Sequence, residues 1–256
     1  MCFLRRFSPS RTTLYCTISV PLKSQDAYNS ASRPYANAVG YAQSGLDSDY
    51  GAVMVTPQFL GIGSSEISLN DIKPVNSEDP DYNIEIQVLD AGGRTQEDQD
   101  YMWIGGEWCN AITEAPVENV TFAPGQGLWV FCYTGESSVG LQNAGKVGTS
   151  DVCVTLDSDF GAVGAGNPFP VSVALADLLP EAEGEVDFDY NIEIQVLDAG
   201  GNTQEDQDYM WIGGKWCNAI TEAPVDNVNF DPGQGLWIFN YTGESDVTIR
   251  FPAPEL

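Results

Sequence analysis

Alternating polar and apolar positions mark strands along most of this chain. Residues 83–88 (Asn-Ile-Glu-Ile-Gln-Val) have a β-branched side chain at every second position, the period-two pattern of a strand with one buried face. Similar runs flank Gly105 and Gly106, and two glycines between such runs suit a two-residue hairpin whose turn needs positive φ. Only residues 69–72 and 173–179 have a helical pattern, and both are short. The pattern predicts an all-β chain with antiparallel hairpins.

The two glycines also predict the register of their hairpin. The expected cross-strand pairs are Ile104 with Glu107, Trp103 with Trp108, and Met102 with Cys109. Because successive side chains of a strand point to opposite faces, the two indoles share one face of the hairpin, while the methionine and the cysteine share the other. The indoles form either an exposed platform or part of the core, since large aromatic residues in strands mostly fill the interior.

One stretch of the sequence occurs twice. Residues 81–137 recur at 189–245 with seven differences in 57 positions, and weaker similarity extends the repeat. The repeat predicts two domains of about 108 residues, at 36–142 and 143–256, each with the size of an ordinary single-core domain. The spacing of the strands favours tandem antiparallel β-sandwich-like or barrel-like domains, and β-trefoil-like units are the alternative.

Residues 1–35 stand outside the repeat and differ from it in charge. Residues 1–33 carry five basic side chains against one acid, whereas residues 34–256 carry five against 36 acids. The basic start, a short apolar stretch at 12–22 and small residues at 36–38 suggest an export signal, and a disordered leader is the alternative. No run approaches the ~18 apolar residues of a spanning helix, so we predict no transmembrane segment.

The formal net charge of −27 restricts the partners that the chain can bind. A surface this acidic repels phosphate backbones and anionic lipids, because binding either requires the neutralisation of negative charge. We therefore expect no nucleic acid as a partner. The acidity by itself indicates either solubility in a salty or extracellular medium or the binding of calcium.

Clustered acids in the predicted loops offer the oxygen ligands that calcium prefers. None of the clusters has the spacing of a helix–loop–helix calcium site, so solvated turn acids are the competing interpretation. We expect no cofactor, with calcium as the alternative. The candidate calcium ligands are Asp47, Asp49 and Asp81 in the first unit, and Asp157, Asp159 and Asp189 in the second.

The chain contains no histidine in 256 residues, which limits its catalytic chemistry. The commonest general base, the Ser–His and Cys–His nucleophile pairs, and most zinc sites are thereby removed. Two carboxylates suffice for glycoside hydrolysis, but among 37 acids the presence of a pair carries no information. We therefore expect no enzyme and assign no catalytic residue.

The aromatic residues of the two hairpins are the best binding candidates. Sugar rings or partner side chains stack on flat aromatic faces, and two copies about one domain apart would give avidity for a repetitive ligand. Trp129 and Trp237, which follow a Pro-Gly turn in a hydrophobic strand, are expected in the core. The candidate ligand-binding residues are Tyr101, Trp103 and Trp108 in the first unit, and Tyr209, Trp211 and Trp216 in the second.

The six cysteines form no framework that both units share. Cys109 and Cys217 are equivalent and are expected to be buried thiols opposite methionines, whereas Cys132 aligns with Asn240 and Cys153 has no counterpart. A disulfide between Cys132 and Cys153 would join the two units and would be compatible with export.

Three motifs connect the chain to a family. They are residues 37–41 (Asn-Ala-Val-Gly-Tyr), an Asn-Pro-Phe triplet at 167–169 followed by residues 175–180, and a Pro-Gly-Gln-Gly-Leu-Trp-Val segment at 124–130. Together they resemble an uncharacterised β-rich repeat domain of exported bacterial proteins. The resemblance covers most of both units and implies exported β domains with no known activity. The first unit departs from it at 56–59, where Thr-Pro-Gln-Phe replaces the triplet.

The sequence therefore predicts a non-enzymatic, secreted or cell-surface protein of two tandem β domains. We expect it to have a structural or adhesive role, with a polysaccharide or a surface protein as its partner. A carbohydrate-binding module that uses the tryptophan hairpins is the alternative, and a carboxylate-dependent glycoside hydrolase is the third hypothesis. The sequence indicates no oligomeric state.

Overall fold

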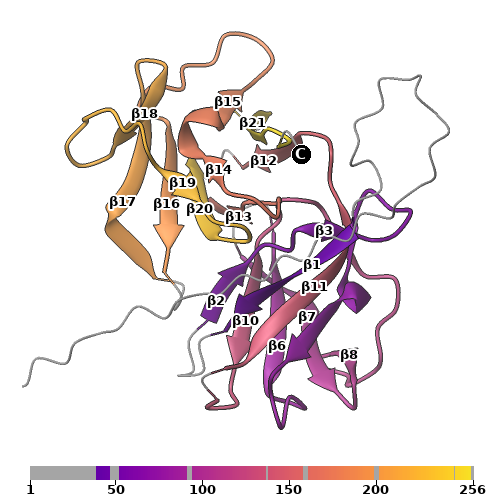
Figure 1. Cartoon of the computed structure of the whole chain (residues 1–256). Coiled ribbons are helices and arrows are strands. Elements are labelled where there is room, and N and C mark those ends of the chain that lie inside the picture. The colour runs from indigo at the N-terminus through magenta and orange to yellow at the C-terminus, as the bar shows by residue number, and fades with distance from the viewer. Residues whose placement is uncertain are drawn as a thin grey trace, which may run out of the picture.

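The computed structural model confirms an all-β chain (Figure 1). The structure describes residues 39–46, 52–90, 94–136, 138–157, 161–198, 202–244 and 246–254. Within those ranges the regular elements are antiparallel strands and short 3-10 helices, and no helix is both long enough and apolar enough to span a membrane. The predicted leader, residues 1–35, lies outside the described residues.

The first unit is a sandwich of two open sheets. Its elements are β1 (Val39–Gly45), β2 (Ala52–Val55), β3 (Phe59–Leu60), β4 (Ile67–Ser68), η1 (Leu69–Asp71), β5 (Ile72–Val75), β6 (Ile84–Leu89), β7 (Thr95–Ile104), β8 (Glu107–Asn110), β9 (Thr121–Phe122), β10 (Leu128–Cys132) and β11 (Gly140–Val147). One sheet has the order β2-β10-β6-β7-β8, and in the other β11 pairs with β1, β3 and β5. Aliphatic and aromatic side chains from both sheets form the main core, and Ala42, Phe59 and Val147 form a smaller buried cluster.

The second unit repeats this plan. Its elements are β12 (Val152–Leu156), β13 (Ala162–Gly166), β14 (Val173–Ala174), η2 (Leu175–Asp177), β15 (Leu179–Glu181), β16 (Ile192–Leu197), β17 (Thr203–Ile212), β18 (Lys215–Asn218), β19 (Asn229–Phe230), β20 (Gly235–Asn240) and β21 (Val247–Phe251). The five-stranded sheet has the order β13-β20-β16-β17-β18, and β12-β21-β15 lies across its core. No sheet closes on itself within the described ranges, so both units are sandwich-like.

The connection between the units is short. β11 pairs with β3 as far as Val147, and β12 of the second unit begins at Val152. The boundary predicted between residues 142 and 143 lies inside β11, because the similarity between the repeats is weak there and does not show where strand pairing ends.

The predicted hairpin register is confirmed in both units. In the first unit Met102 pairs with Cys109, Trp103 with Trp108, and Ile104 with Glu107. The second unit has the same register between β17 and β18. Gly105 and Gly106 have φ angles of 63° and 91°, as the two-residue turn requires. The two segments with a helical pattern contain only the single-turn 3-10 helices η1 and η2.

The two units meet in a contact with approximate two-fold symmetry. Thr56 N donates to Gly233 O at 3.3 Å, and the equivalent Gly166 N donates to Gly125 O at 3.2 Å. Two isolated bridges repeat this exchange, Val55 with Gln234 and Ala165 with Gln126. β2 consequently lies beside β20 (Figure 1). Each unit therefore presents the same edge of its five-stranded sheet to the other.

Candidate functional site

The tryptophan hairpin of each unit faces the core. Trp108 is 1% exposed, and its Nε1 donates to Ile72 O at 2.8 Å. Tyr101 is also buried, while Trp103 is half-buried and packs edge-on against Trp108 with ring centroids 5.1 Å apart. The equivalent residues Tyr209, Trp211 and Trp216 have the same arrangement in the second unit. The structure thus encloses the tyrosine and one tryptophan of each hairpin in the core, whereas the other tryptophan, Trp103 or Trp211, is half-buried and packs against that core. Each hairpin therefore offers one partly accessible indole and not an open platform of three rings.

Trp129 and Trp237 lie on the opposite face of the five-stranded sheets, the outer face. Leu128 and Val130, which flank Trp129, point into the core. Side chains along a strand alternate between faces, so Trp129 points away from the core. Trp129 and Trp237 are half-buried and contact each other across the junction of the units, with ring centroids 5.9 Å apart and an interplanar angle of 40°. The expectation that they are core residues holds in part, because neither belongs to the main core of its unit but both pack against a second buried cluster of Met54, Leu89 and Leu197. Both faces of β10 carry large apolar side chains, so the pattern alone does not distinguish the two positions.

Six half-buried aromatic side chains form a row on the outer faces. This aromatic row consists of Trp129, Phe131 and Tyr133 on and after β10, and Trp237, Phe239 and Tyr241 on and after β20. Phe131 stacks on Tyr133 with ring centroids 6.0 Å apart, and Phe239 stacks on Tyr241 at 5.9 Å. Because the first residues of β10 and β20 meet at the junction, the row runs from one unit through the tryptophan pair into the other.

A buried pair of acids lies beside the row in the first unit. Glu85, on β6, is 9% exposed, and its carboxylate accepts from Gln87 Nε2 at 2.6 Å and from Tyr133 Oη at 3.1 Å. Asp100, on β7, hydrogen-bonds to Glu85, and burial together with the Glu85 charge raises the pKa of Asp100 to about 6. Its buried Oδ1 has no hydrogen-bond partner among the described residues. One of the two carboxyl groups therefore keeps a proton until the pH approaches neutrality.

The second unit has the same acid pair. Glu193 accepts from Gln195 Nε2 at 2.5 Å and from Tyr241 Oη at 3.1 Å. Burial and the Glu193 charge raise the pKa of Asp208 to about 7, and Asp208 Oδ1 is likewise buried without a partner in the described part of the chain. Burial and the neighbouring glutamate also raise the pKa of Tyr241 far above its usual value, so its hydroxyl stays a donor.

The geometry of the acid pairs suits binding better than hydrolysis. The two carboxyl groups of a retaining or inverting glycosidase stand about 5–9 Å apart, with the scissile bond between them. Asp100 and Glu85, and likewise Asp208 and Glu193, are joined by a direct hydrogen bond, which leaves no such space. The pairs instead present acceptor oxygens and amide groups beside flat apolar rings.

Three of the candidate calcium ligands, Asp81, Asp157 and Asp189, lie within the described residues, in separate loops. Asp189 Oδ1 accepts from Gly213 N at 2.9 Å, while Asp81 and Asp157 are half-buried in separate loops. Within the described ranges no group of three or more acids, cysteines or histidines is placed to hold a metal ion. The candidates Asp47, Asp49 and Asp159 lie outside the described residues.

The predicted disulfide between the units is absent. Cys132 is buried at the end of β10 and Cys153 is exposed on β12, and both are free thiols. The prediction failed because a repeat alignment carries no information on the separation of two side chains. The expectation of buried thiols at Cys109 and Cys217 is confirmed, and in each hairpin the thiol pairs with a methionine.

Comparison with known proteins leaves the outer face to be interpreted from its geometry. A scan against protein-family models and a search of curated proteins found no match to this chain, so the resemblance to exported repeat domains stays a prediction. The sequence held one signal for the outer face, which was missed. Glu85 and Gln87, on β6, alternate with buried isoleucines, and Trp129 and Phe131 alternate with buried residues on β10, four strands later in the sequence. Only strand pairing shows that these two sets are neighbours.

Proposed function

We propose that this chain is a non-enzymatic adhesive protein, secreted or displayed at a cell surface, whose two β domains bind an extended polysaccharide along their outer faces. The observation that carries the proposal is the aromatic row, which passes through the junction of the units with an acid pair beside each half. This replaces the tryptophan hairpin as the carbohydrate-binding surface.

The chemistry of the row matches that of a sugar chain. A pyranose ring has an apolar face that stacks on an aromatic side chain, and its hydroxyl groups require donors and acceptors at the edge of that ring. Polar groups lie beside the rings, since Tyr133 Oη donates to Glu85 Oε2 and Tyr241 Oη donates to Glu193 Oε2, each at 3.1 Å.

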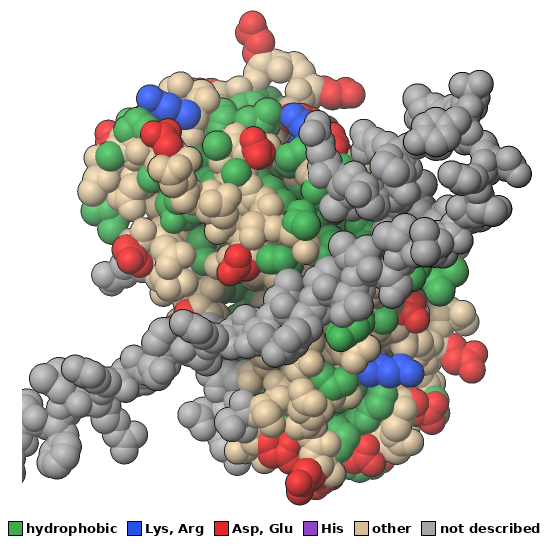
Figure 2. All heavy atoms as spheres, viewed as in Figure 1, with side chains coloured by type: hydrophobic (Ala, Val, Ile, Leu, Met, Phe, Trp, Pro, Cys, Tyr) green, Lys and Arg blue, Asp and Glu red, His purple; other side chains and the backbone are tan. Residues whose placement is uncertain are grey.

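The charge of the protein narrows the class of polysaccharide. Figure 2 shows acidic side chains over both units and few basic ones, and the formal net charge is −27. A polyanion such as an alginate would meet repulsion at the acid pairs, whereas a neutral glucan or an amino-sugar polymer would not. We therefore propose a neutral or amino-substituted polysaccharide as the ligand.

The duplication adds affinity if one polymer contacts both halves of the row. Binding of the second unit is then intramolecular, and its effective concentration is set by the fixed junction and not by a flexible linker. The expected consequence is tighter binding of long oligosaccharides than of short ones with the same repeating unit.

Tryptophan fluorescence and affinity electrophoresis of the full chain would test the proposal, with laminarin, chitosan oligosaccharides and alginate as probes. Phe131→Ala with Phe239→Ala should lower the affinity for the bound probe by about 3- to 10-fold per ring. The control is Ile112→Ala with Ile220→Ala, which removes apolar side chains that are 69% and 70% exposed outside the row. No binding to any probe, or equal loss in the control, would overturn the proposal.

A further inference from the structure

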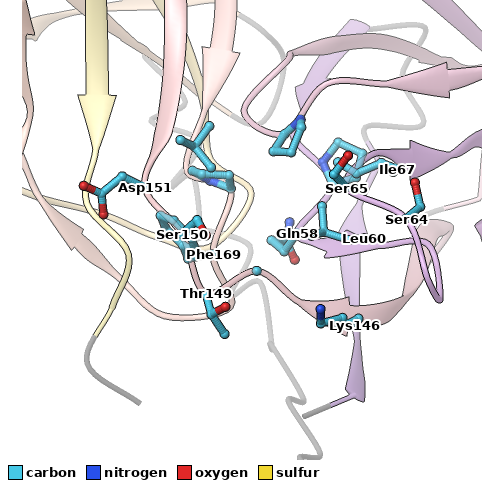
Figure 3. Close-up of a pocket in the computed structure, with 15 residues that line it drawn as sticks. Gln58, Leu60, Ser64, Ser65, Ile67, Lys146, Thr149, Ser150, Asp151 and Phe169 are labelled. Carbon is cyan, nitrogen blue, oxygen red and sulfur yellow. The ribbon is translucent and has the colours of Figure 1, made fainter. Parts of the chain in front are cut away.

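A cavity of about 330 Å³ lies between the two units. None of its lining residues belongs to the aromatic row or to the acid pairs. Figure 3 shows Gln58 and Leu60 of the first unit facing Ser150 and Phe169 across the space. The volume falls at the lower end of the range for small-molecule sites, which is roughly 300–1,000 Å³.

Much of the cavity wall is apolar and rigid. The apolar lining residues are Pro57, Leu60, Ile67, Pro124, Val152, Pro168 and Phe169. Proline rings lock the φ angle of their residues, and Phe169 and Ile67 are each 1% exposed, which fixes them in the core. These walls are therefore formed before any ligand arrives, which suits a compact apolar group.

Gln58 supplies an unused hydrogen-bond acceptor on the wall. The residue is 3% exposed, and its Nε2 donates to Thr56 O at 2.5 Å, which fixes the orientation of the amide. Gln58 Oε1 is buried and has no hydrogen-bond partner among the described residues. A ligand that carries a hydroxyl or an N–H group would pair with it.

Lys146 supplies an unpaired positive charge. Asp151 also lines the cavity, but its carboxylate accepts from Ala253 N at 2.8 Å and forms an ion pair with Arg250 at 3.5 Å. Lys146 is half-buried and makes no ion pair with a carboxylate in the described ranges. The Lys146 ammonium group is therefore available to pair with an anionic group of a ligand in the cavity.

We propose that this cavity binds a small α-hydroxy or α-amido carboxylate with a compact aromatic or branched side chain. The carboxylate pairs with the Lys146 ammonium group, the hydroxyl or N–H donates to Gln58 Oε1, and the side chain packs between Leu60 and Phe169. The site is separate from the polysaccharide surface and does not depend on it.

A titration of the full chain followed by two-dimensional amide NMR would test the site, with phenyllactate as the probe. 3-Phenylpropionate lacks the hydroxyl and phenyllactamide lacks the charge, and each should bind at least 5-fold more weakly. Lys146→Met should lower the affinity for phenyllactate to that for phenyllactamide and leave the affinity for phenyllactamide unchanged. The amide signals of residues 148–151 should shift to saturation.

Gly148→Leu gives a second test that does not remove a polar group. A Cβ at this position would lie in ordinary van der Waals contact, 3.8 Å from Leu60 Cδ1 and 3.9 Å from Phe169 Cε1, so we expect the rest of a leucine side chain to occupy the space that the ligand needs. Phenyllactate binding should be lost while the far-UV spectrum and any polysaccharide binding are retained. Phenyllactate binding that survives Gly148→Leu, or no saturable shift in the unaltered protein, would overturn the proposal.

Discussion

The two units differ most instructively where they touch. Their backbones exchange equivalent hydrogen bonds across the junction, yet Met54 of the first unit is matched by Gly164 in the second. Met54 packs with Leu89 and Leu197, and the two tryptophans of the row pack against this cluster. A Cβ on Gly164 would lie 2.9 Å from Met54 Cε and 3.1 Å from Leu89 Cδ1. The Met54 side chain thus fills the space beside the two-fold axis, and no room is left for a side chain at the equivalent position 164. The backbone contact is symmetric, but the residues that pack there are not.

By contrast, the repeated residues 81–137 and 189–245 differ little between the two units. Five of the seven differences are at exposed positions, and a sixth exchanges Val130 for Ile238 in the core. The aromatic row and the acid pairs are identical in both units. The differences therefore lie mostly at exposed positions, and of the two buried differences only Cys132 and Asn240 exchange an apolar side chain for a polar one.

The largest expected effect comes from making the junction symmetric. Gly164→Met places two methionines on the axis and should destabilise the protein by about 1–3 kcal/mol or more, since overpacking forces the backbone apart. Met54→Gly should cost about 2–5 kcal/mol through the cavity it leaves. Urea unfolding midpoints of the single variants measure both effects.

The double variant separates shape from symmetry. Met54→Gly combined with Gly164→Met moves the one methionine to the other side of the axis, so it should be more stable than Gly164→Met alone. A double variant as unstable as the sum of the two single changes would show that the two halves of the junction are not equivalent.

The second-largest expected effect is at the buried positions of Cys132 and Asn240, where the two units differ in side-chain polarity. Asn240 is fully buried, its Nδ2 donates to Glu244 O at 2.8 Å, and its Oδ1 accepts from Thr242 N at 3.0 Å. Cys132 packs in the core of the first unit, and its thiol lies within hydrogen-bond distance of the Thr134 hydroxyl, at 3.4 Å. Asn240→Cys should therefore cost about 1–3 kcal/mol, whereas Cys132→Asn should be neutral or stabilising. Denaturant unfolding measures both, and a loss larger for Cys132→Asn would contradict the comparison.

The third effect is the pH dependence of stability that each acid pair causes. An unfolded aspartate has a pKa of about 3.9, while Asp100 and Asp208 titrate at about 6 and about 7 in the folded chain. Between these values the folded state binds more protons than the unfolded state, so stability falls as the pH rises through this window. Asn mimics the protonated acid, and Asp208→Asn should therefore raise the Tm by a few degrees at about pH 8 and by little at about pH 4.

Asp100→Asn is the matched variant for this prediction. Its gain should be complete about one pH unit lower than that of Asp208→Asn, because the folded pKa of Asp100 is lower. Thermal melts from about pH 4 to 8 measure both gains, and the net charge of the chain affects the two variants equally. A gain that does not depend on pH would contradict the assignment of a shared proton.

The smallest effect lies at the 3-10 helices. Ser68 Oγ accepts from Asn70 N at 3.3 Å and caps η1, whereas Ala174 leaves η2 without a side-chain cap. Ala174→Ser should stabilise the second unit by about 0.5 kcal/mol, and Ser68→Ala should cost the first unit about as much. Thermal melts would detect the two opposite shifts, and shifts of the same sign would show that the caps are not equivalent.

The sequence by itself determined the features that depend on neighbours along the chain. Period-two alternation predicted the strands, and the pair of glycines at 105–106 predicted the register that joins Trp103 to Trp108, because a two-residue turn permits only one pairing. The duplication predicted two similar units, since near-identical sequences meet the same local constraints.

Only the tertiary structure decided which face of each strand is covered. Trp108 and Trp129 are both large apolar residues in alternating runs, yet one is enclosed by Ile72 and the core while the other meets Trp237 across the junction. The acid pairs and the cavity likewise depend on the tertiary structure. Their members come from separate strands or from both units, and their separation is set by sheet pairing and by the packing of whole units. Such distances do not follow from the order of residues, because each strand has two faces and the pattern along it is compatible with burying either one.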